Sequence, residues 1–131
     1  MNSFRRTNAL LGCTGLIGAV LTLTPLAASA QNAPLSHVAN PGVYKVLTEN
    51  DQFRMVLATW KPGQRDEFHS HPANATYALT ACNVRLYGPD NKVLGEGQRA
   101  SGSVGLQAPI PSHSFENAGT SDCQILIVER K

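Results

Sequence analysis

The sequence has few charged side chains, 15% of its residues, and beyond Arg6 it contains no cluster of basic ones. It therefore lacks the basic surface that nucleic acid or an anionic membrane would need as a partner. Outside the first thirty residues no segment shows a sustained helical period, and no flavin or nucleotide motif is present. These absences argue against a helical fold and against a nucleic-acid partner.

The only long apolar run lies near the start of the chain, between residues 9 and 27. Arg5 and Arg6 precede this run, and Ala28-Ser29-Ala30 ends it with the small-x-small pattern that signal peptidase cleaves. Glycine and proline interrupt the run, which favours a cleaved signal peptide over a permanent transmembrane helix. We expect residues 1–30 to be removed, leaving a periplasmic or secreted protein without a membrane partner.

Cleavage would remove two of the eleven basic residues and none of the nine acidic ones, so the mature chain would be neutral overall. A chain of about a hundred residues suits one domain with its own core. Residues 31–42, with Pro34 and Pro41, are expected to form an extended lead-in, and residues 43–131 to form the domain.

The rest of the chain alternates short β-rich segments with turn residues, which predicts an all-β sandwich or barrel. The strands are expected at 43–47, 53–60, 67–71, 77–87, 92–94, 104–107, 113–117 and 123–130. Residues 125–128 are apolar on both faces, which is typical of a well-buried central strand.

Three of the four histidines fall in two of these strands. His69 and His71 are two residues apart, so strand alternation places both imidazoles on one face, where they can bind the same ion. The same alternation assigns Glu67 to that face. Phe68 would then point away, leaving it exposed or in a homodimer interface.

The surroundings of the histidines carry a more specific pattern. Gly63, His69 and His71 give G-x5-H-x-H, and Gly102, His113 and Asn117 give G-x10-H-x3-N. The pair resembles the two motifs of the cupin superfamily, G-x5-H-x-H-x3-4-E-x6-G and G-x5-P-x-G-x2-H-x3-N. The resemblance implies a single-domain cupin, a double-sheet jelly-roll barrel, with one divalent metal ion on His69, His71 and His113.

The chain departs from the family pattern at the fourth ligand. The family glutamate would fall at Ala75 or Thr76, neither of which has a carboxylate. Asn74 is the nearest substitute as a metal ligand, and Glu67 is the alternative. If Glu67 does not bind the metal, it is the candidate general base. Which of the two residues completes the site stays open at this stage, as does a metal-free pocket.

The resemblance also bears on Cys82 and Cys123, the two cysteines that remain after cleavage. Exported proteins often pair their cysteines, although two unlinked, buried thiols are the alternative. In a cupin, the strand that starts near Tyr77 lies antiparallel to the last strand. The ends that carry the cysteines would then be neighbours, which favours a disulfide.

Three neutral imidazoles would leave the full charge of a divalent ion uncompensated, which favours an anionic or easily deprotonated ligand. Imidazole ligation suits Fe, Mn, Zn, Cu or Ni. We therefore expect a metal-dependent enzyme, a dioxygenase-type oxidoreductase, an isomerase or a lyase, acting on a small anionic or enolisable substrate. The alternative is a non-catalytic cupin that binds a metal or small ligand.

Overall fold

The structure is a computed structural model that describes residues 32–131. The expected signal peptide, residues 1–30, lies outside the described residues. Within residues 32–131, no helix is long and apolar enough to cross a membrane.

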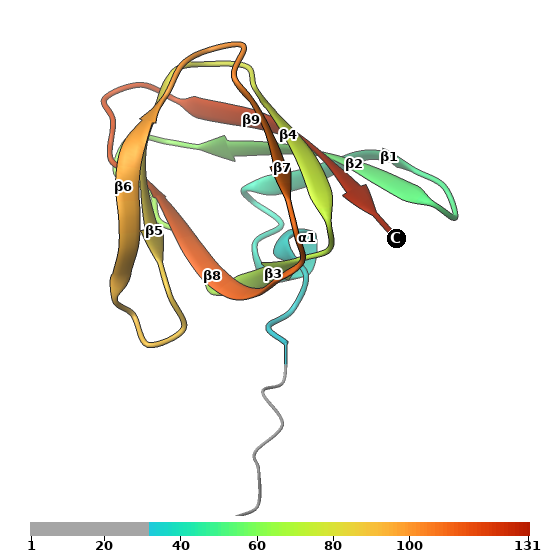
Figure 1. The fold of residues 1–131 in the computed structure, drawn as a ribbon. Helices are drawn as coiled ribbons and strands as arrows, with labels where there is room; N and C mark the ends of the chain where they lie inside the picture. Colours follow the sequence, from blue (N-terminus) through green and yellow to red (C-terminus); the bar gives the residue numbers. More distant parts are fainter. Residues whose placement is uncertain (1–31) are drawn as a thin grey trace, which may run out of the picture.

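Nine antiparallel strands and one short helix make up the described chain (Figure 1). In chain order the elements are α1 (Ser36–Ala39), β1 (Tyr44–Glu49), β2 (Phe53–Trp60), β3 (His69–His71), β4 (Asn74–Ala78), β5 (Cys82–Tyr87), β6 (Val93–Arg99), β7 (Val104–Gln107), β8 (Ile110–Asn117) and β9 (Cys123–Arg130). One sheet has the order β1-β2-β9-β4-β7 and the other β3-β8-β5-β6.

These two facing sheets confirm the prediction of an all-β jelly roll, with one difference from the expected barrel. No strand pairing among the described residues joins β6 to β7 or β1 to β3, so the sheets do not close into a true barrel. Helix α1 packs against both β1 and β3 on one open side. The lead-in is therefore not wholly extended, as was expected, but folds into one helical turn.

Alternation along β9 shows how the sheets create a common interior. Cys123, Ile125, Ile127 and Glu129 are buried, whereas the residues between them are partly exposed on the outer face. The prediction of a central strand at residues 125–128 is confirmed, because β9 is the middle strand of its sheet, but only one of its faces is fully buried and the other is half covered. The buried side chains of the two sheets form one apolar cluster that includes Trp60 and Phe115, whose rings stack at 4.2 Å.

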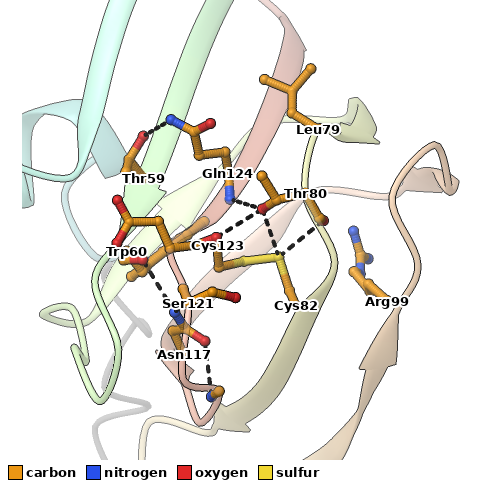
Figure 2. The surroundings of a disulfide bond; sticks show 12 residues. Thr59, Trp60, Leu79, Thr80, Cys82, Arg99, Asn117, Ser121, Cys123 and Gln124 are labelled. Carbon is orange, nitrogen blue, oxygen red and sulfur yellow. Dashed lines mark hydrogen bonds between the residues drawn. A yellow bond between two sulfur atoms is a disulfide. The ribbon is translucent and has the colours of Figure 1, made fainter.

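The segment expected as one strand at residues 77–87 is two strands in different sheets. Between them, the Thr80 hydroxyl donates to the Asp122 carbonyl at 2.9 Å and accepts from the Gln124 amide at 2.9 Å (Figure 2). These bonds hold the chain where it passes from the larger sheet to the smaller one.

Immediately after this crossing, Cys82 forms a disulfide with Cys123, with their Cα atoms 5.1 Å apart (Figure 2). The predicted pairing is confirmed, although the bond joins the starts of β5 and β9 across the two sheets rather than neighbouring strands of one sheet.

Candidate metal centre

The three histidines of the sequence motifs meet at one end of the interior. His69 and His71 lie on β3, and His113 lies on the neighbouring β8, directly opposite His69 in the strand register. One ring nitrogen from each comes within 4.8 Å of the others. A register irregularity between His69 and His71 shifts the partner of His71 to Ile110. The three histidines are positioned to hold a metal ion.

His71 is oriented by a buried carboxylate on the opposite sheet. Its Nδ1 lies 2.8 Å from Oε1 of Glu129, a residue with no exposed surface. The second carboxylate oxygen of Glu129 lies 3.5 Å from Nη1 of Arg54. Burial raises the pKa of Glu129, but the hydrogen bond and charge of His71 and the charge of Arg54 lower it more, so the net shift is downward. Glu129 therefore stays ionised and accepts the His71 Nδ1 proton.

His69 is held by the backbone of the segment just before its strand. Its Nδ1 donates to the Glu67 carbonyl at 2.8 Å, and Asn40 binds both backbone polar groups of Glu67. The Asn40 amide donates to the Glu67 carbonyl at 3.1 Å, and its oxygen accepts from the Glu67 backbone at 2.7 Å. This contact fixes the protonated nitrogen of His69 as Nδ1.

With both Nδ1 atoms donating to oxygen, the Nε2 atoms of His69 and His71 carry lone pairs. These two Nε2 atoms lie 3.0 Å apart. The Tyr44 hydroxyl lies 2.9 Å from the same His69 Nε2 while donating to Asp66 at 2.8 Å. Lone pairs that face each other across so short a distance require a cation between them or a proton on one of them.

His113 adds a third unsatisfied nitrogen, because its Nε2 is buried without a hydrogen-bond partner among the described residues. Burial, together with the neighbouring His69 and His71, lowers the pKa of His113 to about 3. Burial also lowers the pKa of His69, and the charge of Asp66 opposes that shift only in part. Both imidazoles are therefore neutral at neutral pH, the form that binds a metal.

The donor set fits a divalent ion. Imidazole nitrogens bind such ions at about 2.0–2.1 Å, which puts neighbouring ligand nitrogens roughly 3 Å apart. The His69–His71 separation matches this spacing. The Nδ1 atoms of His69 and His71 each donate to an oxygen acceptor, the Glu67 carbonyl and the Glu129 carboxylate. Metal-bound histidines are normally oriented by such an acceptor on the ring nitrogen that does not bind the metal.

A cavity of about 260 Å³ extends from the histidines between the two sheets. Its walls are largely apolar, and His71, Asn74 and His113 are among its lining residues. Asn74 is buried, and its side-chain oxygen has no hydrogen-bond partner in the described chain. This predicted ligand candidate therefore lies in the right cavity with a free oxygen, while its binding to a metal stays a prediction.

Glu67 is not where strand alternation placed it. Its side chain is exposed and does not line the cavity. The reason is that β3 begins only at His69, so the alternation does not extend back to residue 67. In this segment the acidic side chain that points inward is Asp66, whose Oδ1 lies 3.6 Å from Nδ1 of His69. The expectation that Glu67 shares the histidine face is wrong.

Sequence reasoning missed Tyr44, Asp66 and Glu129, which contact the histidines from other elements. Alternation along β9 could have placed Glu129 on the buried face with Ile125 and Ile127, a signal that was available. The contacts of Tyr44 and Asp66 depend on how β1 and the turn before β3 pack, and local sequence carries no signal for them.

Comparison with solved structures decides the fold. A cupin domain from Bordetella pertussis superimposes with a TM-score of 0.61 at 17% identity, covering 68% of this chain and 92% of that one. The chain has the cupin fold. No family model and no curated protein matches the sequence.

Two further structures extend the comparison. A cupin superfamily protein from Desulfitobacterium hafniense has a TM-score of 0.50 at 10% identity, covering 67% of this chain and 75% of that one. A polyketide cyclase from Streptomyces resistomycificus has a TM-score of 0.51 at 18% identity, covering 66% and 63%. The cupin resemblance inferred from the histidine motifs is therefore confirmed at the level of the fold.

Proposed function

We propose that this cupin is an exported metal-dependent enzyme, a dioxygenase-type oxidoreductase, an isomerase or a lyase. It would hold one divalent ion on His69, His71 and His113 and act on a small anionic or enolisable substrate. The observation that carries the proposal is the convergence of three imidazoles, without a carboxylate in the group, at the end of an apolar cavity.

The absence of an acidic ligand matters in two ways. Among the described residues, no Asp, Glu or Cys joins the three histidines in the group. Catalytic metal sites keep a position open for substrate or water, and three protein ligands are the usual number. A bound ion would also keep its full charge, and it would supply Lewis-acid chemistry by polarising a substrate oxygen. Both points favour an anionic ligand in the cavity.

The protein's own groups have assignable roles. Glu129 and the Glu67 carbonyl hold the His71 and His69 rings with Nε2 toward the centre. The apolar walls exclude water from the bound ligand, which strengthens every polar contact there. Glu67 is exposed, so its carboxylate is not part of the proposed chemistry.

Export is supported by two independent features. The first thirty residues have the pattern of a signal peptide. Cys82 and Cys123 form a disulfide, which is common in oxidising compartments and rare in the cytosol.

Metal analysis tests the centre of the proposal. Protein isolated from its native compartment is expected to contain one divalent ion per chain, and His113→Ala is expected to lose it. Gln98→Ala is the control, because Gln98 is exposed on β6 and lies outside the group of three, so its loss should leave the metal content unchanged. Equal metal in the wild type and in His113→Ala would refute the site.

A non-catalytic binding protein is the second candidate, and the free oxygen of Asn74 favours it. If Asn74 is the fourth ligand, the site is better closed, as in storage or capture. Azide added to the Co(II)-loaded protein separates the two. A changed absorption spectrum, with metal retained in Asn74→Ala, supports the open enzyme site. An unchanged spectrum, with metal lost in Asn74→Ala, supports the binding protein.

A further inference from the structure

Arg99 stands at the open side of the cavity. It is the last residue of β6, and it is the one Lys or Arg among the described residues that line the cavity. Strands β6 and β7 end their respective sheets and are not paired with each other in the described chain. Arg99 reaches over this gap, and its Nη1 donates to the Thr76 hydroxyl on β4 at 3.3 Å.

Among the residues that the structure describes, the guanidinium of Arg99 has no acidic partner. No salt bridge within residues 32–131 involves Arg99, and no Asp or Glu lines the cavity there. Its one side-chain hydrogen bond uses a single donor out of five. Two or more donors therefore stay free for a ligand with a planar pair of oxygens.

The backbone around Arg99 leaves room for such a ligand. Register places Gly97 and Gly95 opposite Val84 and Leu86, whose side chains line the cavity. A Cβ atom built on either glycine would meet nothing within 4 Å. Arg99 is therefore the one large side chain that this strand directs inward, and it has open space beside it.

The position of Arg99 relative to the histidines follows from β4. Asn74 and Thr76 both face the cavity, and Asn74 pairs in register with Glu129, the partner of His71. Thr76, which contacts Arg99, lies two residues further along, a step of roughly 7 Å in a strand. The histidines and the guanidinium thus lie toward different ends of one cavity.

The walls between these ends are apolar. They are formed mainly by Trp60, Val84, Leu86, Phe115, Ile125 and Ile127. A volume of about 260 Å³ is below the range of roughly 300–1,000 Å³ that accommodates drug-sized ligands. The ligand must therefore be small, with an apolar body and a charged group at one end.

We propose that the cavity binds a small monocarboxylic acid with an apolar body, whose carboxylate pairs with Arg99. The fork of the guanidinium matches the two oxygens of a carboxylate, which a lysine would not. The body of the acid lies against the apolar walls, and its far end points to the three histidines. This inference deepens the proposed function and rests on it for the direction in which the ligand lies.

Benzoate is a suitable probe, and benzamide is its neutral counterpart of the same shape. Binding of both is measured by NMR titration of ¹⁵N-labelled protein, in the Zn(II)-loaded wild type and in Arg99→Gln. Losing a hydrogen-bonded charge partner should weaken benzoate binding by about tenfold or more. Benzamide should bind the wild type more weakly than benzoate and should be insensitive to Arg99→Gln. Arg99→Lys should give an intermediate loss.

Arg130→Gln is the matched control, because it removes the same charge from an exposed position that does not line this cavity. It should leave benzoate binding unchanged. Equal benzoate affinity in the wild type and Arg99→Gln, equal affinity for benzamide and benzoate, or no binding of benzoate at millimolar concentration would each overturn the inference.

The same titration in His113→Ala distinguishes this inference from the proposed metal function. Arg99-dependent benzoate binding in a protein that binds no metal would support the carboxylate site while the metal centre fails. Stoichiometric metal in the wild type, with benzoate binding independent of Arg99, would support the metal centre and overturn the carboxylate site.

Discussion

At the scale of single residues, the histidine spacing carried most of the information about the site. Two histidines at alternate positions, together with a third beside a cupin-like motif, were enough to predict which rings meet. The groups that orient those rings were not predictable in the same way. Glu129 lies 58 residues from His71 in the chain, and their 2.8 Å contact exists only because the two sheets face each other. Glu67 was misplaced because the pattern does not show where β3 begins.

The first prediction concerns Glu129. Glu129→Gln keeps the shape of the side chain but weakens the acceptor for His71 Nδ1, so the ring is held less firmly and Nε2 is a weaker donor. Loss of such a partner typically lowers metal affinity by about 10–100-fold. Competition for Zn(II) against a chelator measures the change. Glu49→Gln is the control and should leave the Zn(II) affinity unchanged. Glu49 is exposed and pairs with Arg54, which also contacts Glu129, so this variant removes a carboxylate near Glu129 that does not contact His71. Equal affinity in wild type and Glu129→Gln would contradict the role.

The second prediction concerns pH. The pKa of His113 is about 3 in the folded metal-free protein, below the ordinary value of 6.5. Between these values the unfolded chain binds the proton and the folded chain does not, so the free energy of unfolding falls as the pH falls from 6.5 toward 3. One such group contributes at most about 1.4 kcal/mol per pH unit.

His113→Asn removes that group, so its melting temperature should depend less steeply on pH over the same window. Thermal unfolding of the metal-free proteins at a series of pH values is the measurement. Parallel curves for the wild type and the variant would show that His113 titrates normally.

At the scale of elements, long alternating strands were predictable and short or interrupted ones were not. Strands β2 and β9 have the expected bounds because each is an unbroken run of strand-forming residues that follows polar turn residues. The apolar segment at residues 77–87 contains no glycine or proline, so nothing local announces the crossing between β4 and β5. That crossing depends on bonds from Thr80 to Asp122 and Gln124, which are more than forty residues further along the chain. The single turn of α1 is likewise stabilised by its packing on β1 and β3.

The third prediction concerns the disulfide between the sheets. It joins residues 41 apart, and closing a loop of this size stabilises the folded state by roughly 3–4 kcal/mol in the chain-entropy model. Replacing Cys82 and Cys123 together by serine should lower the free energy of unfolding by that amount, measured in urea.

Repeating the urea measurement with a reductant provides the control. The reductant should lower the free energy of unfolding of the wild type and leave that of the doubly substituted protein unchanged. Metal binding at temperatures well below unfolding should persist in both, because Cys123 and Glu129 lie at opposite ends of β9, roughly 20 Å apart. Two free thiols in the folded, exported protein would contradict the prediction.

At the scale of the whole molecule, the lead-in supports the candidate metal centre. The backbone amide of Ser70, between the two histidines of β3, donates to the Pro34 carbonyl at 2.8 Å. The Ser70 hydroxyl donates to the Ala33 carbonyl at 2.6 Å, and the Ala33 amide donates to Pro111 on β8 at 3.0 Å. Asn40 holds the Glu67 peptide that orients His69. The sequence predicted a lead-in at residues 31–42 that is separate from the domain. Residues of that lead-in nevertheless contact the segment that carries the histidines, so they contribute to the candidate site.

The last prediction compares the metal affinity of two shortened proteins, one that starts at Gln31 and one that starts at Gly42. The small-x-small triplet predicts cleavage after Ala30, which leaves every one of these lead-in contacts intact, so a protein that starts at Gln31 should bind metal with full affinity. A protein that starts at Gly42 loses Ala33, Pro34 and Asn40, and with them the support behind β3 and His69. Its metal affinity should fall by at least about tenfold, the scale seen when groups that orient metal ligands are lost.

Intact mass of the exported protein checks the cleavage site, and chelator competition on the two shorter chains checks the role of the lead-in. Asn40→Ala in the chain that starts at Gln31 separates the positioning of His69 from loss of the fold, because circular dichroism should show unchanged β-structure while the metal affinity falls. If the chain that starts at Gly42 is folded and binds metal as tightly as the one that starts at Gln31, the lead-in is only a connection. A mass that retains the first thirty residues would instead contradict the processing.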